Sequence, residues 1–162
     1  MSARPSRNII QSAMEYIRTC LDDPDTGWSG VTVVKQESKI DENIPPIIYV
    51  RLAPDTNWND LEIGSDSVMR NPTLLVEIFG KSDINRMDLK DYLIDMLKSG
   101  FPYNEYEIGE NDITLTKQNG YVTLNGKIGD KEEDVGIPKS ALVAKYRYRH
   151  LLSLPVINNL VE

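Results

Sequence analysis

The chain has 162 residues, of which 40% are hydrophobic and 27% charged, a composition typical of one globular domain with its own core. A formal charge of -7 argues against binding nucleic acid through a general basic field. No apolar run is long enough to span a bilayer, no secretory signal opens the chain, and the one cysteine excludes an internal disulfide. We therefore expect a soluble protein of a reducing compartment.

The first predicted element is an amphipathic helix within residues 1–24. Apolar residues recur at helical spacing from Ile9 to Leu21, Ser6 is a suitable N-cap, and Pro24 ends the helix. Cys20 falls on the apolar face, so we expect a buried and unreactive thiol.

Two β-branched stretches, Val31–Lys35 and Ile47–Leu52, predict strands. Residues 53–71 are rich in Asp, Asn, Gly and Ser, which predicts a long loop of the kind that carries function or folds back as an arm. This loop contains Trp58, Leu61 and Ile63. We regard these three as candidate interface residues, because exposed aromatic side chains commonly anchor interfaces; the alternative is a loop that covers its own core.

The stretch Thr73–Phe79 is the strongest predicted strand, and a second helix is expected at residues 82–100. Ser82 or Asp83 is suited to cap its start and Gly100 to end it. The side chains expected to face the core are Ile84, Met87, Tyr92 or Leu93, Met96 and Leu97.

Polar and apolar residues alternate in Asp112–Thr116 and again in Tyr121–Leu124. Gln118-Asn119-Gly120 between them indicates a hairpin turn. Because acids outnumber lysines here, residues 104–137 predict an acidic hairpin region that is solvated or projects as an arm. The last predicted strand is a long closing strand at residues 141–155.

The order of helix, strands, helix and strands favours a single α+β domain. We expect a mostly antiparallel sheet with both helices packed on one face, together with the acidic hairpin arm.

Few residues suggest chemistry. His150 is the only histidine and has no zinc-ligand set or nucleophile motif around it, so we expect a packed, structural side chain. Asp88, Asp91 and Asp95 share one face of the second helix, and with Glu77 they would suit a divalent metal in a nuclease. We favour a solvated helix face instead. The sequence thus predicts no enzyme, no cofactor and no metal site.

A basic strip lies in the closing strand. Lys145, Arg147 and Arg149 alternate with tyrosines and His150, which places the three cations on one face of a sheet. Simple solvation explains such a strip. The alternatives are an interface with an acidic neighbour, such as the Glu105–Asp134 region of an adjacent subunit, or contact with passing DNA.

Four segments in the middle of the chain follow a recognisable plan. They are Ile47–Leu52, Leu61–Gly64, Pro72–Gly80 and Asp88–Leu97, the last with a DLxDxL-type pattern. With the first helix and the closing strand, they resemble neck proteins of tailed bacteriophages, and they are most similar to tail terminator and tail-completion proteins. The resemblance covers about Ile9 to Tyr106 and the final strand, while residues 106–137 lie outside it.

The resemblance implies a structural virion protein, made in the host cytoplasm and located in the neck of the tail. Such a protein forms a hexameric ring on the tail tube protein, ends growth of the tube, and joins it to head-side connector or neck proteins. DNA passes through the lumen without sequence-specific binding, and no membrane is involved. The alternatives are a cytosolic adaptor that binds a partner by a sheet edge or the acidic arm, and a metal-dependent nuclease that uses the carboxylates of the second helix.

Overall fold

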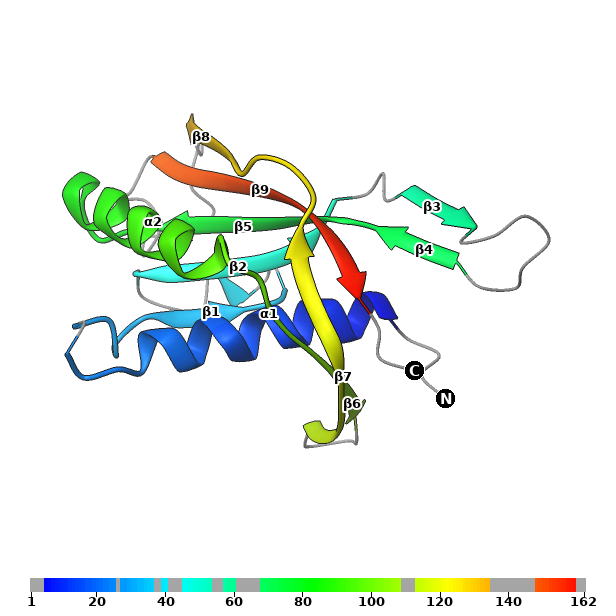
Figure 1. Cartoon of the computed structure of the whole chain (residues 1–162). Helices are drawn as coiled ribbons and strands as arrows, with labels where there is room; N and C mark the ends of the chain where they lie inside the picture. The colour runs from blue at the N-terminus through cyan, green and yellow to red at the C-terminus, as the bar shows by residue number, and fades with distance from the viewer. Residues whose placement is uncertain are drawn as a thin grey trace.

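The computed structural model describes residues 5–25, 27–36, 39–40, 45–53, 57–60, 68–108, 113–134 and 148–159. These ranges contain two helices and nine strands, whose arrangement is drawn in Figure 1. In chain order they are α1 (Pro5–Leu21), β1 (Thr32–Val34), β2 (Ile47–Leu52), β3 (Asn57–Asp60), β4 (Val68–Asn71), β5 (Thr73–Phe79), α2 (Asp83–Leu97), β6 (Phe101–Ile108), β7 (Ile113–Leu124), β8 (Gly129–Asp134) and β9 (Tyr148–Asn159).

Seven of these strands form one curled sheet. The order across it is β1-β2-β5-β9-β7-β6, and β8 pairs with β9 beside this path. Only β1 and β2 run parallel; all other pairs are antiparallel. The strands β3 and β4 form a separate two-stranded ribbon. The predicted α+β class with a mostly antiparallel sheet is confirmed.

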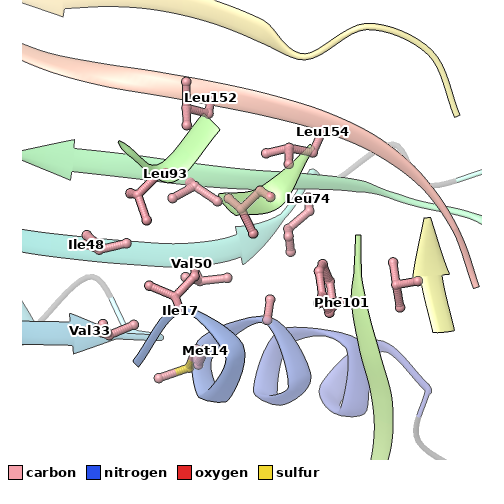
Figure 2. Close-up of a cluster of buried hydrophobic side chains, with 14 of the residues drawn as sticks. Met14, Ile17, Val33, Ile48, Val50, Leu74, Leu93, Phe101, Leu152 and Leu154 are labelled. Carbon is pink, nitrogen blue, oxygen red and sulfur yellow. The ribbon is translucent and has the colours of Figure 1, made fainter. Parts of the chain in front are cut away.

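Both helices pack on the same face of the sheet and share one core with it. α1 contributes Met14 and Ile17, and α2 contributes Leu93. Figure 2 shows Ile17 and Leu93 pointing toward the core side chains of β2, β5 and β9. Alternate residues of the central strands supply this core, as the twofold period of a strand requires; on β5 and β9 they are Leu74, Val76, Ile78, Leu152, Leu154 and Val156.

The second helix begins and ends as predicted, and the predicted inward positions Leu93 and Leu97 are buried, but the inward positions predicted for its first half are not. Ser82 is the N-cap and accepts a hydrogen bond from the Asn85 amide, and Gly100 has the left-handed φ of 82° that favours glycine after a helix. The predicted inward positions Ile84 and Met87 are wrong, because Ile84 is 73% exposed and Met87 is also exposed.

The buried stripe of α2 is instead Arg86, Leu89, Leu93 and Leu97. The Arg86 side chain points toward the core because Gly80, directly after β5, packs closely against the Arg86 backbone. A Cβ atom on Gly80 would lie only 2.6 Å from the Arg86 amide nitrogen, a contact that only glycine avoids. The guanidinium also finds acidic partners there, which offset the cost of burying its charge.

Three further predictions need correction. The first helix begins at Pro5, so Ser6 is not its N-cap, and proline is well suited to a first helical position. Gln118-Asn119-Gly120 makes no hairpin turn, since β7 continues through it; Gly120, with φ of 101°, lies where the β6–β7 register shifts, as a β-bulge requires. Cys20 is half-buried rather than buried.

Candidate interaction surfaces

The acidic residues of α2 stay on the solvent side. Asp88, Asp91 and Asp95 are exposed, and the last two pair with lysines, Asp91 with Lys90 at 3.0 Å and Asp95 with Lys98 at 2.6 Å. Over the described ranges, no three His, Cys, Asp or Glu side chains are grouped closely enough to hold a metal ion. Glu77 does not join these carboxylates, because it lies between Val76 and Ile78 and faces away from the core they share with α2.

Glu77 is the centre of a charged cluster on the other face of the sheet. Its side chain is 3% exposed. The Nε of Arg51 lies 3.2 Å from one carboxylate oxygen, and an Nη of Arg149 contacts the other. A buried carboxylate needs such partners, because desolvation penalises an isolated charge by several kcal/mol. The three residues come from adjacent strands, β2, β5 and β9.

Arg149 also reaches β8. Its second Nη lies 2.9 Å from Glu133, and this hydrogen bond lowers the pKa of the Glu133 carboxyl below its ordinary value. Of the predicted basic strip, Arg149 therefore has acidic partners within its own chain, and one of them belongs to the Glu105–Asp134 region expected to supply an acidic neighbour. Lys145 and Arg147 lie outside the described residues.

A second charged cluster joins α2 to β8 and β9. Arg86, whose side chain is 4% exposed, lies 2.9 Å from Asp83 and 3.6 Å from Glu132. Its guanidinium also stands over the Tyr148 ring, 5.9 Å from the centroid, which is within cation–π range.

Beside Arg86, Asp130 links the same three elements. One oxygen lies 3.0 Å from Nδ1 of His150, and the other lies 3.1 Å from Nζ of Lys90. The hydrogen bonds of Lys90 with Asp91 and then Asp130 raise the pKa of its ammonium group. His150 is buried next to the core residues of β9, so the expected packed position is confirmed.

Side chains of α1 occupy the outer edge of β6. The Ser12 hydroxyl accepts a hydrogen bond from the Asn104 amide at 2.9 Å and lies 3.2 Å from the Asn104 carbonyl. Asn8 accepts from the Tyr106 amide, and Arg7 donates to the Tyr106 carbonyl. These polar side chains take the place of a neighbouring strand, which protects an edge from pairing with another chain.

The same helix also reaches the opposite edge of the sheet. Arg18 donates a hydrogen bond to the carbonyl oxygen of Val33, in β1, at 3.1 Å. Between α1 and β1 lies a groove of about 600 Å³, lined on the helix side by Glu15, Arg18 and Thr19. Within this groove, Arg18 and Glu15 form an ion pair at 2.7 Å.

Two partly buried tyrosine hydroxyl groups hold the helices together. Tyr16 donates to the carbonyl of Met96 at 3.0 Å, and Tyr92 donates to the carbonyl of Cys20 at 2.6 Å. Burial, together with the nearby thiol, raises the pKa of Tyr16 to about 12. Burial likewise raises the pKa of Cys20, so this thiol remains protonated and a weak nucleophile at neutral pH.

The predicted long loop contains a two-stranded ribbon that extends away from the sheet (Figure 1). Trp58 lies in β3, in register with Arg70 of β4. Leu61 and Ile63 lie outside the described residues. The ribbon is attached through β4, which continues past Pro72 into β5.

A second projection is formed by β6 and β7, whose paired ends reach below α1 in Figure 1. Leu115 is in register with Tyr106, and Ile113 shares that face of β7. Tyr106 is buried under α1, whereas Leu115 is 56% exposed and Ile113 40%. Glu107 and Thr114 pair on the opposite face of the ribbon. The sequence pattern placed Ile113 and Leu115 on one face but gave no sign that this face is uncovered.

Comparison with known proteins adds no relative: no protein-family model matches the chain, and neither does any curated protein. Neither of the two described helices is long and apolar enough to cross a membrane.

Proposed function

We propose that this chain is a structural protein of the neck of a tailed bacteriophage. Copies of it form a ring that caps the tail tube, ends its growth, and helps join tail to head around a channel for DNA. The role is one of assembly and not of catalysis. The proposal rests first on the resemblance of the strand and helix segments to tail terminator and tail-completion proteins.

The observation in the structure that best supports assembly is the β6–β7 projection. A two-stranded ribbon is marginally stable in water by itself, and this one exposes Leu115 and Ile113 on a single face. Apolar side chains concentrated on one face of a projecting ribbon suit contact with another subunit. A ring needs two different patches per subunit, and a second projection, β3–β4, extends from another part of the sheet (Figure 1).

Two further features favour this role over the alternatives. An adaptor that adds a strand to a sheet edge would find Val33, Asn104 and Tyr106 already hydrogen-bonded to α1. A nuclease that uses the α2 carboxylates would lack Glu77, which is paired with arginines on the far face. The net charge of -7 is consistent with a channel through which DNA slides without adhesion.

Electron microscopy of the purified protein, with and without tail tubes, tests the proposal. We expect closed rings on tube ends, and we expect Leu115→Glu to abolish them because a charge cannot be buried at an apolar contact. Thr114→Glu is the matched control, since Thr114 is the exposed neighbour on the opposite face of the same strand. If neither the parent protein nor a variant binds to tail tubes, or if the two variants form rings equally well, the proposed role of this ribbon is wrong.

A further inference from the structure

The strand β8 differs from the other strands of the sheet in what attaches it. Its sequence, GDKEED, contains no apolar residue, and five of its six positions are exposed. Among the strands that the structure describes, it pairs with β9 alone. Since burial of apolar surface is the dominant stabilising term in proteins, β8 depends on its backbone ladder and on its charges.

The charges of β8 are divided between the two faces of the sheet. Asp130 and Glu132 point to the α2 side, where they meet His150, Lys90 and Arg86. Glu133 points to the other side, where it meets Arg149. The acidic strand is thus held from both faces by four basic side chains of α2 and β9, which we call the basic seat: Arg86, Lys90, Arg149 and His150.

The two ends of β8 join their neighbours in the chain through segments of different length. At its start, Asn125–Ile128 connect it directly to β7, and the Asn125 amide donates to the carbonyl of Pro155 in β9 at 2.7 Å. At its end, Asp134 is paired with Tyr148, and residues 135–147 lie between the two in the sequence.

We propose that β8 is a salt-releasable strap whose opening exposes one edge of β9 together with the basic seat. Salt weakens the ion pairs that hold it, because the carboxylates of β8 are partly exposed and therefore screened. The rest of β9 stays in place, since its other edge pairs with β5 and its alternate side chains lie in the core. This inference does not depend on the proposed neck function.

The backbone of β9 offers an internal control for this opening. Val156 donates to Pro72 on the β5 side, whereas the carbonyl of Pro155 accepts from Asn125 on the other side. Because successive residues of a strand direct their backbone groups to opposite neighbours, the amides of Arg149, Leu151 and Ser153 point toward β8. Those of His150, Leu152 and Leu154 point toward β5.

Amide hydrogen exchange of the full chain, followed by NMR at about 0.1 M and about 1 M salt, tests the strap, since the Debye length falls from about 10 Å to about 3 Å over that range. Exchange reports local opening. We expect the amides of Arg149, Leu151 and Ser153 to exchange about tenfold faster at high salt, while those of His150, Leu152 and Leu154 do not change. Equal responses of the two sets, or no response of either, would overturn the proposal.

A variant pair provides the second readout. Glu132→Gln with Glu133→Gln removes two of the strap's acids at its surface and should accelerate the same three amides at low salt, without accelerating the β5-facing ones. Asp88→Asn, which removes an exposed acid of α2, is the control and should leave both sets unchanged. A double variant whose β8-facing amides exchange as in the parent would also overturn the proposal.

Discussion

The two neighbours that share one edge of β9 are attached to it in different ways. The strand β7 pairs with residues 156–159 and brings Val122, which is fully buried, into the core beside Val156. The strand β8 pairs with residues 148–153 and brings only charged side chains and a glycine. One half of the same strand edge is therefore fixed by apolar burial, and the other half by ion pairs.

The difference shows how one sheet can be both rigid and adjustable. Apolar burial is non-directional and changes little with ionic strength, whereas exposed ion pairs are weakened by salt and by titration. The core face of β5 and β9 sets the fold. The charged side chains around Glu77, Arg86 and Asp130 determine how firmly β8 is attached to β9.

The largest expected effect on stability comes from a buried apolar side chain of β9. Leu154, fully buried in β9, packs in the core next to the half that β7 covers. Leu154→Ala should lower the free energy of unfolding by about 4 kcal/mol, because it removes buried methyl groups and leaves a cavity. Urea unfolding at low and at high salt measures this, and the loss should be the same at both. A loss that varies strongly with salt would contradict apolar anchoring; Leu115→Ala, at an exposed site, is the control.

The next largest effect on stability is expected from the charged cluster around Glu77, on the face of the sheet away from the helices. Glu77→Gln keeps the shape of the side chain but leaves Arg51 and Arg149 without the carboxylate they share. Removing one partner of a buried pair costs about 3–5 kcal/mol, and we expect about 3 kcal/mol because the two arginines are 33% and 27% exposed. Chemical denaturation gives the value. A variant as stable as the parent would show that the cluster contributes nothing to the fold.

A smaller effect is expected from pH. The pKa of Glu133 is lower in the folded protein than in the unfolded chain, chiefly because of Arg149, so its ionised form adds stability above its unfolded pKa of about 4.3. That stability is lost as pH falls through the folded pKa. Glu133→Gln should therefore reduce stability at pH 7 and flatten its decline in acid. Parallel acid profiles of parent and variant, measured by thermal unfolding, would contradict this assignment.

The smallest expected effect tests the alternative of a metal enzyme. Replacing Asp88 and Asp91 together by Asn should change stability by no more than about 0.5 kcal/mol, as for most surface substitutions, and should leave ring assembly intact. Assembly on tail tubes and binding of Mg²⁺ or Mn²⁺ by calorimetry are the measurements. Tight metal binding by the parent that disappears in the variant would favour the enzyme.

Much of the fold was predictable because local signals agreed with tertiary demands. Ser82 and Gly100 mark the ends of α2 by their own backbone preferences. The β-branched and apolar run Thr73–Phe79 is a strand at the centre of the sheet. In these segments the residue type itself favours the structure found.

Other features depend on partners far away in the sequence. Arg86 is buried and Ile84 exposed because Gly80 and Glu132 surround the start of α2, which spacing within the helix does not reveal. Asn119-Gly120 allows a positive φ, but whether it becomes a turn or a bulge depends on the pairing with β6. The strand β8 contains no apolar residue from which a strand could be predicted. Its only sequence signal is a dense run of charged residues, and their partners lie on α2 and β9.

Imaging of virus particles assembled with and without this protein tests the proposed neck role most directly. The proposal predicts a ring of this protein where the tail tube meets the head, and tails of uncontrolled length, detached from filled heads, when the protein is missing. Particles that lack it and yet carry normal tails joined to filled heads would contradict the proposal.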